Sequence, residues 1–111
     1  MIIRIQILRE EDSMIDYLTL GNISSETVDK IIENNTESRI CDLSCNGQEC
    51  LKIIEYMRQI GIKCIDELLI NYSDIFLWDY EDFVNKINKL NIPYLVQCVN
   101  VDINAIEFIY N

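Results

Sequence analysis

The clearest structural signal in the chain is the stretch QECLKIIEYMRQIG, residues 48–61. Its apolar residues Leu51, Ile54 and Met57 recur every three positions, and most of the polar residues between them fall on the opposite side of a helix. Gly61 follows, and glycine commonly ends a helix because it adopts the left-handed conformation without a steric cost. The stretch therefore predicts an amphipathic helix that packs against a core.

Similar apolar spacing predicts further helices on both sides of this stretch. The expected helices lie between Ser13 and Leu20, between Ser25 and Asn34, from Ile65 to Tyr72, from Asp79 to Leu90, and from Asp102 to Tyr110. Asn91 and Pro93 are expected to end the fourth of these helices.

Three other segments predict β-strands. Ile2–Leu8 alternates in part between isoleucine and polar residues, Arg39–Leu43 is a short mixed run, and Tyr94–Val101 contains three valines. The spacing of the last segment also suits a helix. We therefore expect one domain over residues 1–111 with an α+β fold, rich in helix with a small sheet, and an all-α helical array is the alternative.

The alternative rests on an internal similarity between three helix ends. The segments YLTLGNI (17–23), YMRQIGI (56–62) and KINKLNI (86–92) each run from a helix end through Gly or Asn to Ile. Helical repeats produce such a pattern. The stretch Ile65–Leu90 also resembles a helical repeat of the mitochondrial transcription terminator type, although it lacks that repeat's proline. This resemblance implies an array of helices that binds nucleic acid.

The chain is strongly acidic throughout, with a net charge of −10. Residues 1–55 hold 11 acidic and 5 basic residues, and residues 56–111 hold 8 acidic and 4 basic residues. The negative charge is therefore spread over the chain and does not come from a detachable acidic tail. An acidic surface repels phosphate backbones and attracts basic proteins. We therefore expect a basic protein as partner and no nucleic acid.

The chain shows no apolar run of about 20 residues and no secretory signal pattern, so we expect a cytoplasmic protein without a membrane partner. Its five cysteines cannot all pair within the chain. They include no Cys-x-x-Cys pair, and the chain has no histidine, so we expect no metal site and no cofactor. We interpret the cysteines as small buried hydrophobic residues.

The missing histidine also bears on catalysis. Without it the chain cannot form a Ser–His or Cys–His nucleophile pair, and it has no Gly-rich phosphate loop. We therefore expect no enzyme. Acidic residues between positions 74 and 82 alternate with Phe76, Trp78 and Tyr80. Carboxylates so grouped could serve acid–base chemistry or hold a cation, they could cap a helix beside a packed core, or they could form a recognition surface.

In size, acidity and lack of catalytic residues, the chain resembles small bacterial toxin-immunity proteins of the contact-dependent inhibition type. The resemblance implies a non-catalytic inhibitor that forms a one-to-one complex with a basic, nuclease-like toxin domain. The alternative is a helical-repeat module that binds nucleic acid or another protein. We predict the partner contacts to be Asp74, Trp78, Asp79, Tyr80, Glu81 and Asp82.

Overall fold

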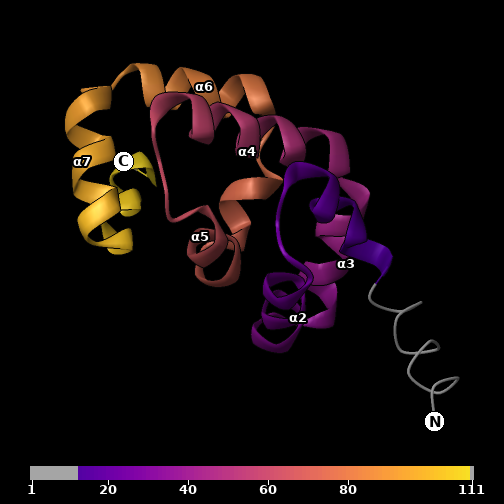
Figure 1. Cartoon of the computed structure of the whole chain (residues 1–111). Coiled ribbons are helices and arrows are strands. Elements are labelled where there is room, and N and C mark those ends of the chain that lie inside the picture. The colour runs from indigo at the N-terminus through magenta and orange to yellow at the C-terminus, as the bar shows by residue number, and fades with distance from the viewer. Residues whose placement is uncertain (1–12, 111) are drawn as a thin grey trace, which may run out of the picture.

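The computed structural model describes residues 13–110, and every regular element in that range is a helix (Figure 1). Elements marked η are 3₁₀ helices. In chain order the elements are η1 (Ser13–Gly21), α2 (Ser25–Asn34), α3 (Glu37–Cys45), α4 (Gly47–Ile60), α5 (Ile65–Asn71), η2 (Ser73–Leu77), α6 (Tyr80–Asn88), α7 (Ile92–Val101) and η3 (Ile103–Tyr110).

The expected α+β class is wrong, because residues 13–110 contain no strand and form a helical bundle. The segment Arg39–Leu43 lies within α3, and Tyr94–Val101 lies within α7. The third predicted strand, Ile2–Leu8, lies outside the described residues. The all-α alternative therefore gives the correct class for the part of the chain that the structure describes.

Local capping explains why α7 is a helix despite its valines. The side-chain oxygen of Asn91 accepts a hydrogen bond from the backbone N–H of Tyr94 at 3.2 Å, which satisfies a donor of the first turn. Pro93 lies in that first turn, where the missing proline N–H costs nothing. Leu95 and Val99, four residues apart, are both buried. Pro93 therefore follows the end of α6 and also lies in the first turn of α7.

Helix capping and burial of one helix face also explain why Arg39–Leu43 lies in α3. The hydroxyl of Thr36 accepts a hydrogen bond from the backbone N–H of Arg39 at 3.1 Å, and Ile40 and Leu43 are buried three residues apart. The capped first turn and the buried face together outweigh the extended preference of the short run.

The central prediction is confirmed. Helix α4 covers the quoted stretch and buries Ile53, Ile54 and Met57. Gly61 follows it with a φ of 101°, and its N–H donates to the carbonyl of Arg58 at 3.1 Å. The other predicted helices are present as η1, α2, α5, α6 and η3.

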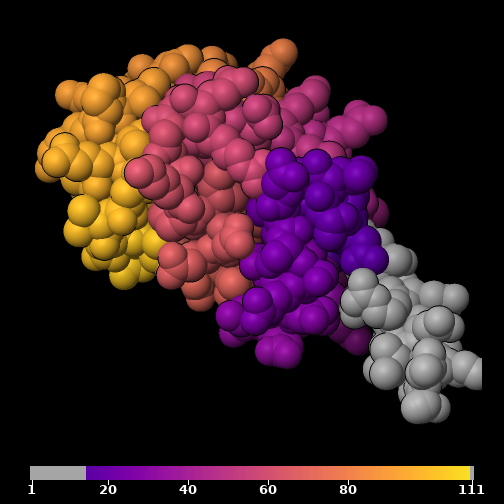
Figure 2. Space-filling view, in the orientation of Figure 1, coloured from indigo at the N-terminus to yellow at the C-terminus, as the bar shows by residue number. Residues whose placement is uncertain are grey.

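The helices form stacked units. We call α2, α3 and α4 the first unit, and α5, η2 and α6 the second unit. Equivalent elements touch, because α2 contacts α5, α3 contacts η2 and α4 contacts α6. Helices α7 and η3, the α7–η3 pair, follow in the chain, and Figure 2 shows the colours succeeding one another along the molecule. Each of the three similar segments ends just before or at the start of α2, α5 or α7.

The joint between the first and second units, the inner joint, contains a buried polar network. Ser73 is 2% exposed, and its hydroxyl donates to Asn35 Oδ1 at 2.7 Å while it accepts from Arg39 Nη1 at 3.0 Å. The amide of Asn35 in turn donates to the carbonyl of Ile31 at 2.8 Å. Among the described residues, no buried side-chain nitrogen or oxygen lacks a partner. The network therefore fixes the stacking without leaving an unsatisfied group.

The joint between the second unit and the α7–η3 pair, the outer joint, lies at the surface. The Tyr72 hydroxyl donates to Glu107 Oε2 at 2.6 Å and also lies 2.7 Å from Asn104 Oδ1. On the α7 side, Asn100 accepts from the backbone N–H of Lys63 at 2.8 Å and donates to the carbonyl of Gly61 at 3.0 Å. These bonds position the surfaces described next.

Candidate binding surface

The six predicted contact residues lie in η2, in the turn after it and in the first turn of α6. The structure brings three of them together, because Trp78, Asp79 and Asp82 line one groove of about 570 Å³. We call it the Trp78 groove, and its other lining residues, all from α6 or its C-terminal end, are Asn85, Lys86 and Lys89. Glu81 is exposed but does not line the groove.

Trp78 is held at the groove by two aromatic neighbours. Its ring centroid lies 6.2 Å from that of buried Phe83 and 6.2 Å from that of Tyr110, in edge-to-face arrangements of 72° and 67°. Such pairs orient an indole well because the positive ring edge meets the negative face. The half-buried indole therefore presents a fixed apolar surface in the groove that Asp79 and Asp82 also line.

Asp79 is the N-cap residue of α6, but its side chain makes no capping hydrogen bond. Glu49 of α4 performs that task, because its Oε1 accepts from the backbone N–H of Tyr80 at 2.7 Å. This bond, with Lys52 Nζ 3.5 Å away, holds the pKa of Glu49 below its usual value. Asp79 therefore does not cap α6 with its side chain, whereas Glu81 and Asp82 lie in the first turn, where negative charge is favourable. The capping bond comes from Glu49, 30 positions before Asp79.

Tyr80 and Asp74 make contacts with other residues of the protein itself. The Tyr80 ring packs edge-to-face on Tyr56 of α4, with centroids 6.2 Å apart, and Lys52 Nζ lies 5.9 Å from its centroid. The Asp74 carboxylate accepts from the Tyr110 hydroxyl at 2.6 Å, and burial followed by this bond raises the pKa of Tyr110. Both residues thus help to build the surface on which the other three lie.

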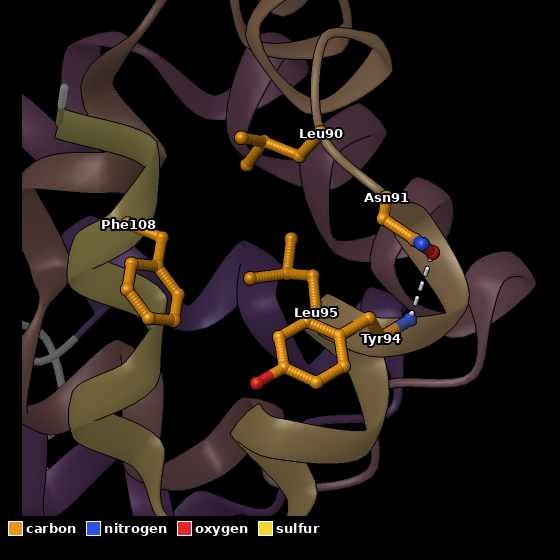
Figure 3. A pocket seen from close by; sticks show the side chains of 5 residues that line it. All are labelled: Leu90, Asn91, Tyr94, Leu95 and Phe108. Carbon is orange, nitrogen blue, oxygen red and sulfur yellow. Dashed lines mark hydrogen bonds between the residues drawn. The ribbon is translucent and has the colours of Figure 1, made fainter.

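An apolar pocket near the C-terminal end of the described range was missed by the sequence reasoning. It measures about 300 Å³ and is lined by Leu90, Asn91, Tyr94, Leu95 and Phe108 (Figure 3). We call it the Phe108 pocket. In Figure 3, Phe108 on η3 faces Leu90 and Leu95 across the opening. A second hollow of about 420 Å³ shares Tyr94 and Phe108 and continues to Val101.

These side chains are unusually exposed for their size. Tyr94 is 61% exposed, Val101 85% and Phe108 49%. Contiguous exposed apolar surface commonly marks a site of interaction. Tyr94 and Val101 lie seven residues apart and share a helix face, which would have been a usable signal had Tyr94–Val101 been interpreted as a helix.

The cysteines do not gather into a site. No group of three metal-ligating side chains occurs in residues 13–110. Cys50 is buried, which raises the pKa of its thiol to about 11, and here the interpretation as a small core residue is right. It is wrong for Cys41 and Cys45, which are exposed.

No protein-family model, curated protein or solved structure matches this chain. Within the described range, no helix combines the length and the apolar character that a membrane crossing requires.

Proposed function

We propose that this protein acts without catalysis, by binding a basic protein in a one-to-one complex. The observation that carries the proposal is the Trp78 groove, which an anchored indole lines together with the carboxylates of Asp79 and Asp82, although Lys86 and Lys89 line it as well. Tryptophan is enriched among the residues that contribute most to protein–protein affinity, and neighbouring acids favour a partner rich in Lys and Arg.

The surface charge on the first helices of the two units supports the same partner. Helices α2 and α5 contact each other, and their exposed side chains include five carboxylates against one lysine, Lys30. The carboxylates belong to Glu26, Asp29, Glu33, Asp66 and Glu67. The negative electrostatic field of these carboxylates speeds the encounter with a basic protein surface, and added salt screens this attraction.

The more specific form of this proposal is an inhibitor of the toxin-immunity kind. It would cover the substrate-binding surface of a basic, nuclease-like toxin domain, and it would do so in the cytoplasm. The acidic surface supports this form because it carries the charge of a polyanionic substrate.

The test is affinity capture from the native host with the full chain and two charge-reversed variants. Asp82→Lys changes the Trp78 groove, and Glu55→Lys makes the same charge change at an exposed position of α4, outside both acidic surfaces, as a matched control. We expect wild type to recover one stoichiometric basic protein that is released by salt. Asp82→Lys should weaken the complex at least about tenfold, whereas Glu55→Lys should weaken it only slightly.

Recovery of no stoichiometric partner would contradict the proposal. Equal weakening by both variants would show that net charge, and not the groove, governs binding. The inhibitor form is then tested by assaying the partner's toxicity with and without the chain, and an unaffected activity would contradict it.

The stacked units favour a second candidate, a helical-repeat module that binds nucleic acid, because arrays of this kind offer extended binding surfaces. It requires a basic face, and the chain has only nine Lys and Arg residues against 19 acids. A gel-shift titration at low salt separates the two candidates. We expect no shifted band with DNA or RNA, and saturable retention would favour the second candidate.

A further inference from the structure

Helices η1, α4 and α6 form a row, because α4 contacts both η1 and α6. Phe83 of α6 is 0% exposed and contacts Trp78 at the end of η2, so the last helix of the second unit buries apolar surface beside η2. Within residues 13–110 no helix follows η3 that could do the same for the α7–η3 pair.

Two hollows lie on α6 and on the α7–η3 pair. The Trp78 groove runs along α6, where Asp82, Lys86 and Lys89 lie at helical spacing on one face. The Phe108 pocket begins at the next residue, Leu90, and lies between α7 and η3. Together they extend from the first turn of α6 to the α7–η3 pair, and we call this surface the helix seat.

We propose that the helix seat binds one amphipathic helix of a partner protein, which lies beside α6 as α6 lies beside α4. This inference rests on the proposed protein-binding role, but it does not require that the partner be a toxin. Helix-in-groove recognition uses apolar anchors spaced three or four residues apart on the bound helix.

The dimensions define the partner helix. The neighbouring members of the row have 14 residues in α4 and 9 in α6, so a segment of similar length suffices. Helix α6 buries Phe83 and Ile87, which are four residues apart. A pocket of about 300 Å³ lined by Leu90, Leu95 and Phe108 can accept a large apolar anchor of this kind.

The charges along the seat restrict the partner further. Asp79 and Asp82 lie at one end of the Trp78 groove, and Lys89 lies at the other. A matching helix therefore carries Lys or Arg at one end of its apolar stripe and Asp or Glu at the other. A second copy of this chain is disfavoured, because two bodies of net charge −10 repel each other.

Trp78, the single tryptophan of the chain, reports directly on the seat. The probe is a designed 14-residue helical peptide without tryptophan or tyrosine. It has leucine anchors four residues apart, lysines at one end and glutamates at the other. We expect saturable one-to-one binding to the full chain, seen as a change in Trp78 fluorescence and in calorimetry. Phe108→Ala should weaken it at least about tenfold, and Leu20→Ala, which truncates an exposed leucine in η1, should leave it unchanged.

A charge exchange then tests the electrostatic part. Lys89→Glu should weaken the mixed-charge peptide several-fold, and a peptide with lysines at both ends should restore binding to this variant. No saturable signal in either method would overturn the proposal, as would equal losses in Phe108→Ala and Leu20→Ala. Self-association that Phe108→Ala abolishes would assign the seat to a second copy instead. Recovery of a basic partner in the capture experiment without peptide binding would leave the protein-binding role standing and reject the helix seat.

Discussion

The inner joint and the outer joint connect the same kinds of element by different means. At the inner joint, Ser73 is 2% exposed and bonds to Asn35 and Arg39. At the outer joint, the Tyr72 hydroxyl bonds to the carboxylate of Glu107 at the surface. Buried networks are costly to break because the groups left behind are desolvated, whereas surface bonds exchange with water at little cost.

This difference separates the regions that hold the fold from those that offer binding surface. Apolar residues of both completed units belong to one buried core, which also takes in Leu95, Val99, Ile106 and Ile109 of the α7–η3 pair. The outer joint leaves Tyr94, Val101 and Phe108 exposed. We expect stability to depend mainly on the inner joint and binding mainly on the outer joint.

The largest difference in stability should appear between alanine substitutions of two phenylalanines, one at each joint. Phe83 is fully buried in α6 beside Trp78 and Tyr56, and Phe108 is 49% exposed on η3. We expect Phe83→Ala to lower the free energy of unfolding by about 3–5 kcal/mol, because it leaves a cavity between packed rings. Phe108→Ala should cost about 1 kcal/mol or less.

Urea unfolding of the two variants at 25 °C measures both values. A loss in Phe108→Ala as large as that in Phe83→Ala would mean that the open end is part of the core, and the distinction between the joints would fail.

The next effect concerns the polar network of the inner joint. Ser73→Ala removes the group that joins Arg39 and Asn35, and it leaves both in a half-buried site. We expect a loss of about 1–3 kcal/mol in the free energy of unfolding. Ser25→Ala, at an exposed position in α2, is the matched control and should change the value by about 0.5 kcal/mol or less. Equal losses would show that the network contributes nothing specific.

Much of the helical content could be predicted from the sequence, because helix periodicity is a local property. The stretch at residues 48–61 shows this, since its apolar spacing and Gly61 suffice. Tyr94–Val101 and Arg39–Leu43 were misinterpreted because their β-branched residues compete with capping by Asn91 and Thr36, and only the folded chain decides that competition.

The surfaces were less predictable because they depend on contacts between distant residues. The sequence placed acids next to Trp78, but it could not show that Asp74 would bond to Tyr110, 36 positions away. The Phe108 pocket joins Leu90 and Phe108 from separate elements, and no local pattern marks such a meeting. Side chains that the fold uses internally and those left for a partner look alike in a sequence.

The smallest predicted effect is a pH dependence confined to the outer joint. The bond to Glu107 raises the pKa of Tyr72 from 10.0 to about 12 in the folded protein. Because the folded state holds this proton more tightly than the unfolded chain, its contribution is complete below about pH 10. It is lost as the pH rises through about 12. The thermal midpoint of wild type should therefore fall more steeply above pH 10 than that of Tyr72→Phe. Ser73→Ala changes no titrating group, so its difference from wild type should stay constant over the same range. Melting curves between pH 8 and 11.5 provide the measurement, and parallel curves for wild type and Tyr72→Phe would show that the tyrosine–carboxylate bond does not hold the outer joint.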